Sequence, residues 1–133
     1  MNKLVRDALG PQEHLVVLDD FYTAESLLEA MSRLEFIVGS RYHAIIAAMT
    51  SGVPPLILGW SWKYHELMKL FGLLPQVLDY KNMSIEEILA AVDRTWEGRE
   101  AMRQKILDVL PSLEASANSV MDRTAEILRG IGK

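Results

Sequence analysis

Cysteine is absent from the 133 residues of this chain, and histidine occurs only three times. A disulfide framework and a thiolate metal site are therefore excluded, and three scattered histidines predict no zinc centre. No apolar run approaches the roughly 20 residues of a transmembrane helix, and residues 1–10 lack the continuous apolar core of a signal peptide. We expect a soluble, cytoplasmic protein that uses no metal and no cofactor.

Basic residues are fewer than acidic ones, with 14 Lys and Arg against 18 Asp and Glu and a formal charge of −4. No run of Lys or Arg interleaves with aromatic residues, as the groove of a nucleic-acid-binding protein requires. We therefore expect no DNA or RNA partner. Hydrophobic residues make up 50% of the chain, which predicts a buried core and a single folded domain over residues 1–133.

Short apolar runs predict β-strands at residues 14–18, 36–38, 56–58 and 76–78. Each run is followed by a helical pattern: one that begins after Thr23, one over residues 41–51, one over 62–71 and one that reaches Trp96. Ser84 and Glu87 form the capping box that starts the last of these helices. The alternation predicts an α/β fold, a Rossmann-like parallel sheet of about four strands with flanking helices.

The C-terminal third shows a longer helical pattern. Apolar residues recur at spacings typical of one helix face at Met102, Ile106, Val109, Leu113, Val120, Ile127 and Leu128. From Arg99 onward they predict a long amphipathic helix. Pro111 lies inside this pattern and has no backbone N–H, so we expect it to kink or divide the helix.

Arg41 is the only fully charged residue between Phe36 and Trp60. It follows Ser40 at the point where a predicted strand leads into a predicted helix, and that stretch contains no Asp or Glu as a counter-ion. Lys63 occupies the equivalent position one strand later. Because ligands bind at the carboxyl ends of parallel strands, both cations are predicted to lie beside a binding cleft.

A cation in the first turn of a helix is unfavourable, because the helix N-terminus already carries a partial positive charge. A bound anion would offset that cost. Backbone N–H groups over residues 40–42, the Ser40 hydroxyl and the Arg41 guanidinium would hold a phosphate or carboxylate, and His43 would bond the ligand or transfer a proton. The sequence thus predicts an anion site that consists of Ser40, Arg41, Tyr42, His43 and Lys63.

Each charged or titratable member of this set also has a structural interpretation. Arg41 would instead pair with Asp19 or Asp20, and Lys63 would simply reach solvent. His43 would be a buried histidine that bonds a backbone carbonyl. The sequence leaves both interpretations open.

Trp60 and Trp62 flank Ser61 in the loop after the third predicted strand. Exposed indoles there would stack on a sugar ring, while packing between domains is the structural alternative. The Tyr42 side chain is expected in packing contacts, and His65 is expected on the surface. Glycine-rich nucleotide loops, a nucleophile elbow and a zinc-protease motif are all absent, so the residues alone predict an anion-binding α/β domain and no particular reaction.

The segment from Phe36 to Lys63 resembles the C-terminal half of the polysaccharide pyruvyl transferases. It carries an Arg-x-His-Ala helix start at residues 41–44, a Gly-Val-Pro strand entry at residues 52–54 and a lysine-containing loop, in the family's order. The resemblance implies a GT-B-like enzyme of exopolysaccharide biosynthesis. Such enzymes transfer an enolpyruvyl unit from phosphoenolpyruvate to two hydroxyls of a sugar.

The resemblance also implies roles for individual residues. Arg41 and His43 would hold the phosphate and carboxylate of the donor, with the Tyr42 backbone alongside. Lys63 would add a further cation at the same site. His43 would be the catalytic acid that protonates the donor's methylene carbon.

By the same resemblance, residues 1–133 are expected to supply an incomplete C-terminal half of a two-domain enzyme, so activity of this chain alone is left open. The open sheet edge would be covered by a second copy or by a missing partner domain. Two rival interpretations remain: the donor domain of a nucleotide-sugar glycosyltransferase, and a non-catalytic interaction domain that dimerises.

Overall fold

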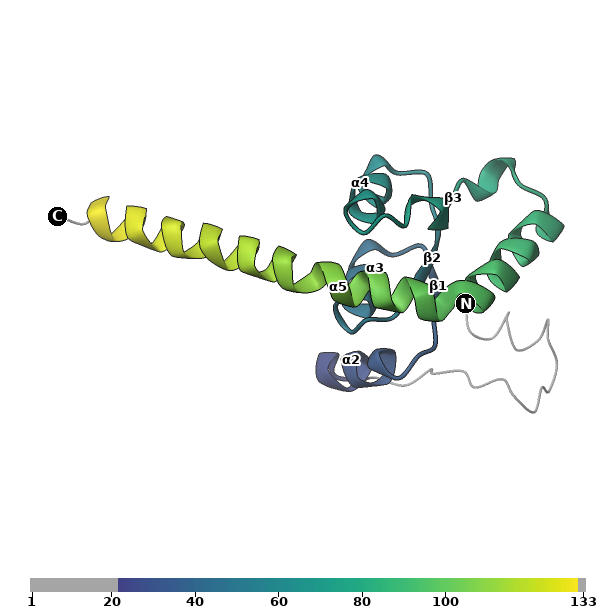
Figure 1. The fold of residues 1–133 in the computed structure, drawn as a ribbon, viewed down its shortest axis with the longest axis horizontal. Helices are drawn as coiled ribbons and strands as arrows, with labels where there is room; N and C mark the ends of the chain where they lie inside the picture. Colours follow the sequence, from purple (N-terminus) through teal and green to yellow (C-terminus); the bar gives the residue numbers. More distant parts are fainter. Residues whose placement is uncertain (1–21, 132–133) are drawn as a thin grey trace.

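The computed structural model describes residues 22–131, which form a parallel three-stranded sheet flanked by helices (Figure 1). In chain order the elements are α2 (Ala24–Ser32), β1 (Ile37–Gly39), α3 (Tyr42–Thr50), β2 (Pro55–Leu58), α4 (Trp62–Leu70), the 3₁₀ turn η1 (Leu74–Gln76), β3 (Val77–Leu78), the 3₁₀ turn η2 (Tyr80–Asn82) and α5 (Ile85–Ile131). The predicted α/β class is confirmed. Three of the four expected strands are present, and the strand expected at residues 14–18 lies outside the described residues.

The strands pair in the order β1-β2-β3, and both pairs are parallel. Ile57 in the central strand pairs with Gly39 on one side and with Val77 on the other. The connecting helices α3 and α4 are followed by Gly52 and Gly72, whose φ angles are +74° and +64°. A residue with a Cβ atom is strained in that conformation, so these glycines let the chain reverse toward the next strand.

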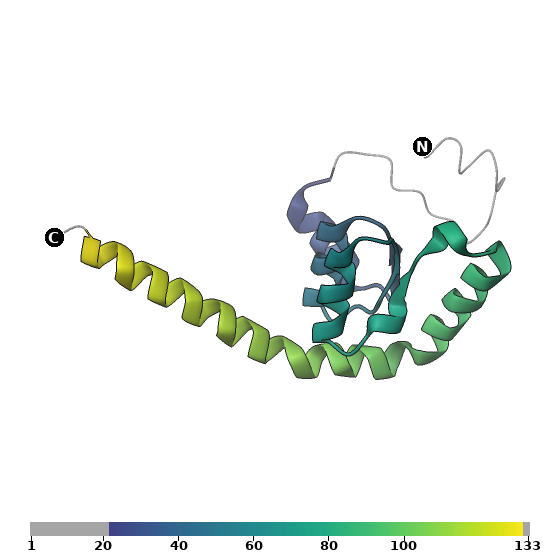
Figure 2. The ribbon, with the colours of Figure 1, turned by 90° about the horizontal axis from the view of Figure 1, so that it is seen from above.

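The sheet separates two apolar clusters, because successive side chains of a strand point to opposite faces. Figure 2 shows α3 and α4 on one side of the strands and the start of α5 on the other. On the second face, Leu56 and Leu78 pack against Ala91 of α5. On the first face, Ile57 packs with buried residues of α3, α4 and α5, namely Ile45, Met49, Tyr64, Met68, Met102 and Ile106.

The middle of α5 crosses the amino ends of the strands. Just before β1, Arg99 Nε lies 3.2 Å from Glu35 Oε2, and Arg103 donates to the Glu35 backbone carbonyl at 3.3 Å. Just before β2, a Cβ atom added to Gly52 would lie 3.0 Å from Leu107 Cδ2, so the helix packs directly on the backbone there. α5 therefore covers one face and the amino ends of the sheet, and it leaves the carboxyl ends uncovered.

The continuity of α5 corrects two expectations. The helix expected to end at Trp96 and the helix expected from Arg99 are one helix of 47 residues. Gly98 costs the helix about 1 kcal/mol relative to Ala, but burial of the flanking turns in the two clusters holds it in place. Of the two effects expected at Pro111, a kink or a division, the structure excludes the division, because the helix continues through this residue. Pro111 is exposed, so the carbonyl that loses its N–H partner reaches water instead.

Beyond Pro111, α5 projects away from the rest of the domain (Figures 1 and 2). Its apolar residues there are exposed: Val120 by 63%, Met121 by 70%, Ile127 by 56% and Leu128 by 64%. The predicted amphipathic face is thus buried only in the first half of the pattern. No helix among residues 22–131 combines the length and apolar composition that crossing a bilayer requires.

Because only the first half of α5 is buried, the same substitution should lower stability by different amounts at two isoleucines. Ile106 is fully buried, whereas Ile127 is 56% exposed. We expect Ile106→Ala to lower the free energy of unfolding by about 2–5 kcal/mol, because it leaves a cavity beneath the sheet. The control Ile127→Ala should change it by no more than about 0.5 kcal/mol. Urea unfolding measures both, and equal losses would contradict the exposed placement of the C-terminal segment.

Candidate functional site

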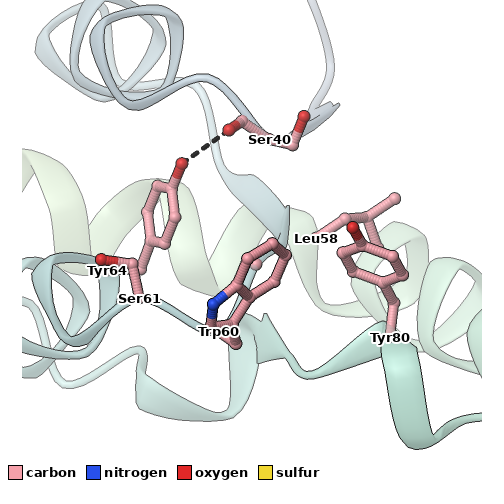
Figure 3. Close-up of a pocket in the computed structure, with 7 residues that line it drawn as sticks. Ser40, Leu58, Trp60, Ser61, Tyr64 and Tyr80 are labelled. Atoms are coloured by element: carbon pink, nitrogen blue, oxygen red, sulfur yellow. Dashed lines mark hydrogen bonds between the residues drawn. The ribbon is translucent and has the colours of Figure 1, made fainter.

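The carboxyl ends of the three strands surround a cavity of about 280 Å³ (Figure 3). The turn after β1 contributes Ser40, the end of β2 and the following turn contribute residues 58–61, and the turn after β3 contributes Tyr80. Tyr64, from the first turn of α4, completes the wall. None of the described residues that line the cavity is charged, so its polar groups are hydroxyls, an indole N–H and backbone atoms.

Tyr64 forms the part of the cavity wall that lies between the turn after β1 and the turn after β2. Its hydroxyl donates a hydrogen bond of 2.6 Å to the backbone carbonyl of Ser40, which joins α4 to the turn after β1 (Figure 3). Its ring lies against Gly59, where an added Cβ atom would be only 2.7 Å from Tyr64 Cε2. A glycine at the end of β2 is therefore what allows the tyrosine to reach Ser40. This arrangement pre-organises one side of the cavity.

Aromatic side chains form the other side of the cavity. The rings of Trp60 and Tyr80 lie 6.0 Å apart and are tilted by 58° to each other. Lys81 Nζ lies 3.6 Å from the centroid of the Trp60 ring, a cation–π contact that covers one face of the indole. Trp60 nevertheless remains 55% exposed, so part of its ring is accessible at the mouth of the cavity.

The helices α2 and α5 have ordinary N-terminal caps. The Thr23 side chain accepts a bond from the Ser26 N–H at the start of α2. At the start of α5, the Ser84 N–H donates to Glu87 Oε2 at 2.7 Å, and the Glu87 N–H donates to Ser84 Oγ, which confirms the predicted capping box. In each of these helices a first-turn N–H group thus has a side-chain partner.

Glu25, the acidic residue in the first turn of α2, shows that negative charge is favoured at this helix start. A hydrogen bond from its own backbone N–H, and a second one with the Thr23 side chain, lower the pKa of Glu25 from its ordinary value. The charged carboxylate is therefore the favoured form at a helix N-terminus.

The helices α3 and α4, which begin directly beside the cavity, lack these features. The N-cap residues of α3 and α4 are Arg41 and Ser61, and neither forms a side-chain capping bond. Neither helix has an acidic residue in its first turn. Lys63 lies in the first turn of α4 instead. Positive charge is thus concentrated at the two helix starts beside the cavity.

Arg41 and His43 lie at the start of α3, and both are exposed. Within residues 22–131, no carboxylate lies within ion-pairing distance of Arg41. The alternative partners Asp19 and Asp20 fall outside the described residues. Neither Arg41 nor His43 lines the cavity, although Arg41 directly follows Ser40, which does. The exposure of His43 does not fit the alternative of a buried histidine.

Lys63 lies in a second hollow, of about 440 Å³, that extends along α4 beside Tyr42 of α3. Trp62, Glu66, Leu67 and Leu70 also line it, so its described walls hold a carboxylate as well as the cation. The Tyr42 ring lies 5.8 Å from the ring of Tyr64 and contacts the core, which confirms the expected packing role. The expected surface position of His65 is also confirmed. Of the five predicted residues, only Ser40 lines the first cavity, and Tyr42 and Lys63 meet in the second.

Tyr64 and Tyr80 belong to the cavity but were not predicted from the sequence. Tyr80 follows the predicted strand 76–78 by two residues, so the rule that parallel strands end at one edge points to it. The sequence indicates Tyr64 more weakly, because its position on the side of α4 that faces β1 follows only from where the helix begins after Ser61. Distances between elements cannot be read from spacing along the chain.

Comparison with known proteins supports the family resemblance. Residues 1–61 match the family described as polysaccharide pyruvyl transferase. The matched range contains the Arg-x-His-Ala and Gly-Val-Pro elements and ends before Lys63. No curated protein and no solved structure matches the chain. The predicted resemblance is thus confirmed over the matched residues.

The contact between Gly59 and Tyr64 predicts opposite effects for one substitution at two glycines. Gly59→Ala should lower stability by about 1–3 kcal/mol, because its Cβ atom would overlap the Tyr64 ring. Gly98→Ala should raise stability by up to about 1 kcal/mol, since Gly98 lies inside α5 and its added Cβ would meet only Met102 Cε, at 3.5 Å. Thermal or urea unfolding compares the two, and a neutral Gly59→Ala variant would disprove the close contact.

Proposed function

We propose, from the match of residues 1–61 to the polysaccharide pyruvyl transferases, that this chain is the donor-binding portion of such an enzyme. The donor is phosphoenolpyruvate, and the acceptor is a sugar of a polysaccharide. In this proposal the chain forms the donor-side domain of a two-domain, GT-B-like enzyme. The acceptor-binding domain would face the carboxyl ends of β1, β2 and β3.

The observation that carries this proposal is the pair of uncapped, cationic helix starts beside one cavity. Arg41 precedes the first turn of α3, and Lys63 lies in the first turn of α4. Phosphoenolpyruvate carries a phosphate and a carboxylate, so it would supply a negative charge to each of two positive positions. The capped starts of α2 and α5 offer no such positions.

The chemistry proposed with it is the one that the family resemblance implies. His43 would donate a proton to the methylene carbon of the donor, which creates an oxocarbenium-like centre at the neighbouring carbon. The two sugar hydroxyls would attack that centre in turn, while the bond from it to the phosphate oxygen breaks. One hydroxyl proton replaces the proton given by His43, and the other leaves with the phosphate. Arg41 and Lys63 would stabilise the departing phosphate.

Calorimetric titration tests the donor site directly. Wild-type protein should bind phosphoenolpyruvate more tightly than inorganic phosphate or a uridine nucleotide. Arg41→Ala should weaken that binding by about tenfold or more, because a charge-assisted bidentate bond is lost. Lys63→Ala should cause a smaller loss. The control Lys69→Ala, in the last turn of the same helix, should bind as wild type does.

Other outcomes of this titration would reject the proposal. Preference for the uridine nucleotide would favour the donor domain of a nucleotide-sugar glycosyltransferase. Equal losses for Lys63→Ala and Lys69→Ala would mean that only net charge matters. Absence of binding by all three ligands would favour a non-catalytic role.

A dimerising interaction domain is the second candidate, and the exposed apolar residues of α5 favour it. Beyond Pro111, Leu113, Ala117, Val120, Thr124 and Ile127 recur at alternating spacings of four and three residues. That pattern is typical of a coiled-coil seam, which pairs two helices along one stripe. In this candidate the partner is a second copy of the chain, because the same stripe is self-complementary about a two-fold axis.

Sedimentation equilibrium tests this second candidate. Wild-type protein should have twice the mass of one chain, and the double variant Val120→Glu with Ile127→Glu should have the mass of one, because charges in the seam prevent pairing. The control Asp122→Asn lies outside the stripe and should leave the dimer intact. A wild-type monomer at all concentrations, or a double variant that still dimerises, would reject pairing through α5.

A further inference from the structure

The cavity at the carboxyl ends of the strands differs chemically from the helix starts beside it. Its described lining residues carry no charge, while Arg41 and Lys63 do not line it. A phosphate placed inside would find no lining side chain of opposite charge, which is costly in a partly enclosed site. The anion predicted beside α3 and α4 therefore does not account for this cavity. Its lining fits an uncharged ligand.

Several polar groups of the cavity have no hydrogen-bond partner among residues 22–131. They are the hydroxyls of Ser40, Ser61 and Tyr80 and the indole N–H of Trp60. The Tyr64 hydroxyl differs, because it already donates to the Ser40 carbonyl. The uncommitted groups include both donors and acceptors. A ligand with several hydroxyl groups would satisfy them, whereas an apolar ligand would leave them without partners.

The aromatic walls favour a ring that is not flat. Trp60 and Tyr80 are tilted by 58°, so they do not form the parallel slot in which a planar base would stack on both sides. Lys81 already covers one face of the Trp60 indole. The remaining indole surface has the negative potential of an aromatic face, which attracts weakly positive C–H groups. A sugar ring has such C–H groups on one side and hydroxyls around its rim.

We infer that this cavity binds one pyranose ring of a neutral saccharide. Trp60 contacts the C–H face of the ring, and the Ser40, Ser61 and Tyr80 hydroxyls bond its rim. The volume of about 280 Å³ suits a single sugar unit, because it lies just below the range of roughly 300–1,000 Å³ in which sites for larger small molecules fall. Binding of the sugar is independent of the proposed function, but its role as the pyruvyl acceptor rests on that function.

The position of Ser40 gives the sugar a defined relation to the donor site. Ser40 lines the cavity, and Arg41 follows it directly in the chain. A sugar in the cavity therefore lies next to the helix start at which the anion is proposed. The bond from Tyr64 to the Ser40 carbonyl would hold the two positions at a fixed separation.

Saturation-transfer NMR on the full chain tests this inference, with the methyl glycosides of glucose, galactose and mannose as probes. We expect saturation of the C–H protons of at least one glycoside. Trp60→Ala should weaken its binding by about three- to tenfold, and Tyr80→Phe, which keeps the ring, by about two- to tenfold. The control Trp62→Ala removes an indole that is 70% exposed and outside the cavity, and should change nothing.

Further measurements separate this inference from the donor site. Arg41→Ala should leave glycoside binding unchanged, and Tyr80→Phe should leave phosphoenolpyruvate binding unchanged. The inference is overturned if no glycoside receives saturation, if uridine displaces the glycoside, or if Trp62→Ala weakens binding as much as Trp60→Ala. It is also overturned if inorganic phosphate competes with the sugar, because the cavity would then be the anion site itself.

Discussion

Parallel pairing of three short strands is the constraint on which the rest of this domain depends. Because β1, β2 and β3 run in the same direction, the turns that follow them must meet at one edge of the sheet. Ser40, Trp60 and Tyr80 are 20 residues apart in sequence at each step, yet they line one cavity. The same geometry brings the first turns of α3 and α4 to that edge. A cavity and two helix N-termini thus occupy one side of the molecule for a single topological reason.

The long helix α5 makes this arrangement asymmetric. Its early turns cover the second face of the sheet, and its middle crosses the amino ends, where Arg99 and Arg103 contact Glu35. Hydrophobic burial is the larger contribution there, since exposed ion pairs add little to stability. With one face and the amino ends enclosed, the carboxyl ends are the edge that α5 leaves accessible. The element that stabilises the fold therefore also determines which edge of the sheet remains accessible.

At this edge, charged residues and an uncharged cavity lie only a few residues apart along the chain. Arg41 and Lys63 stand at helix starts that have no side-chain caps, while Ser40 and Ser61, close by in sequence, line a cavity whose described walls are uncharged. The proposed transfer from an anionic donor to a neutral sugar would require both environments next to each other. The Tyr64 bond to the Ser40 carbonyl links the two, because it ties the start of α4 to the turn that precedes α3.

The sequence by itself determined the fold class, the strand positions within residues 36–78, the caps at Thr23 and Ser84, and the presence of the cations Arg41 and Lys63 at two helix starts, because these follow from local patterns and from residue chemistry. Only the tertiary structure decided the rest. It brought Tyr64 and Tyr80 to the cavity, placed Arg41 and His43 outside its wall, and kept α5 continuous through Gly98 and Pro111. These outcomes depend on contacts between residues that are distant in sequence: burial of Met102 and Ile106 outweighs the helix-breaking tendency nearby, and spacing along the chain does not reveal such contacts.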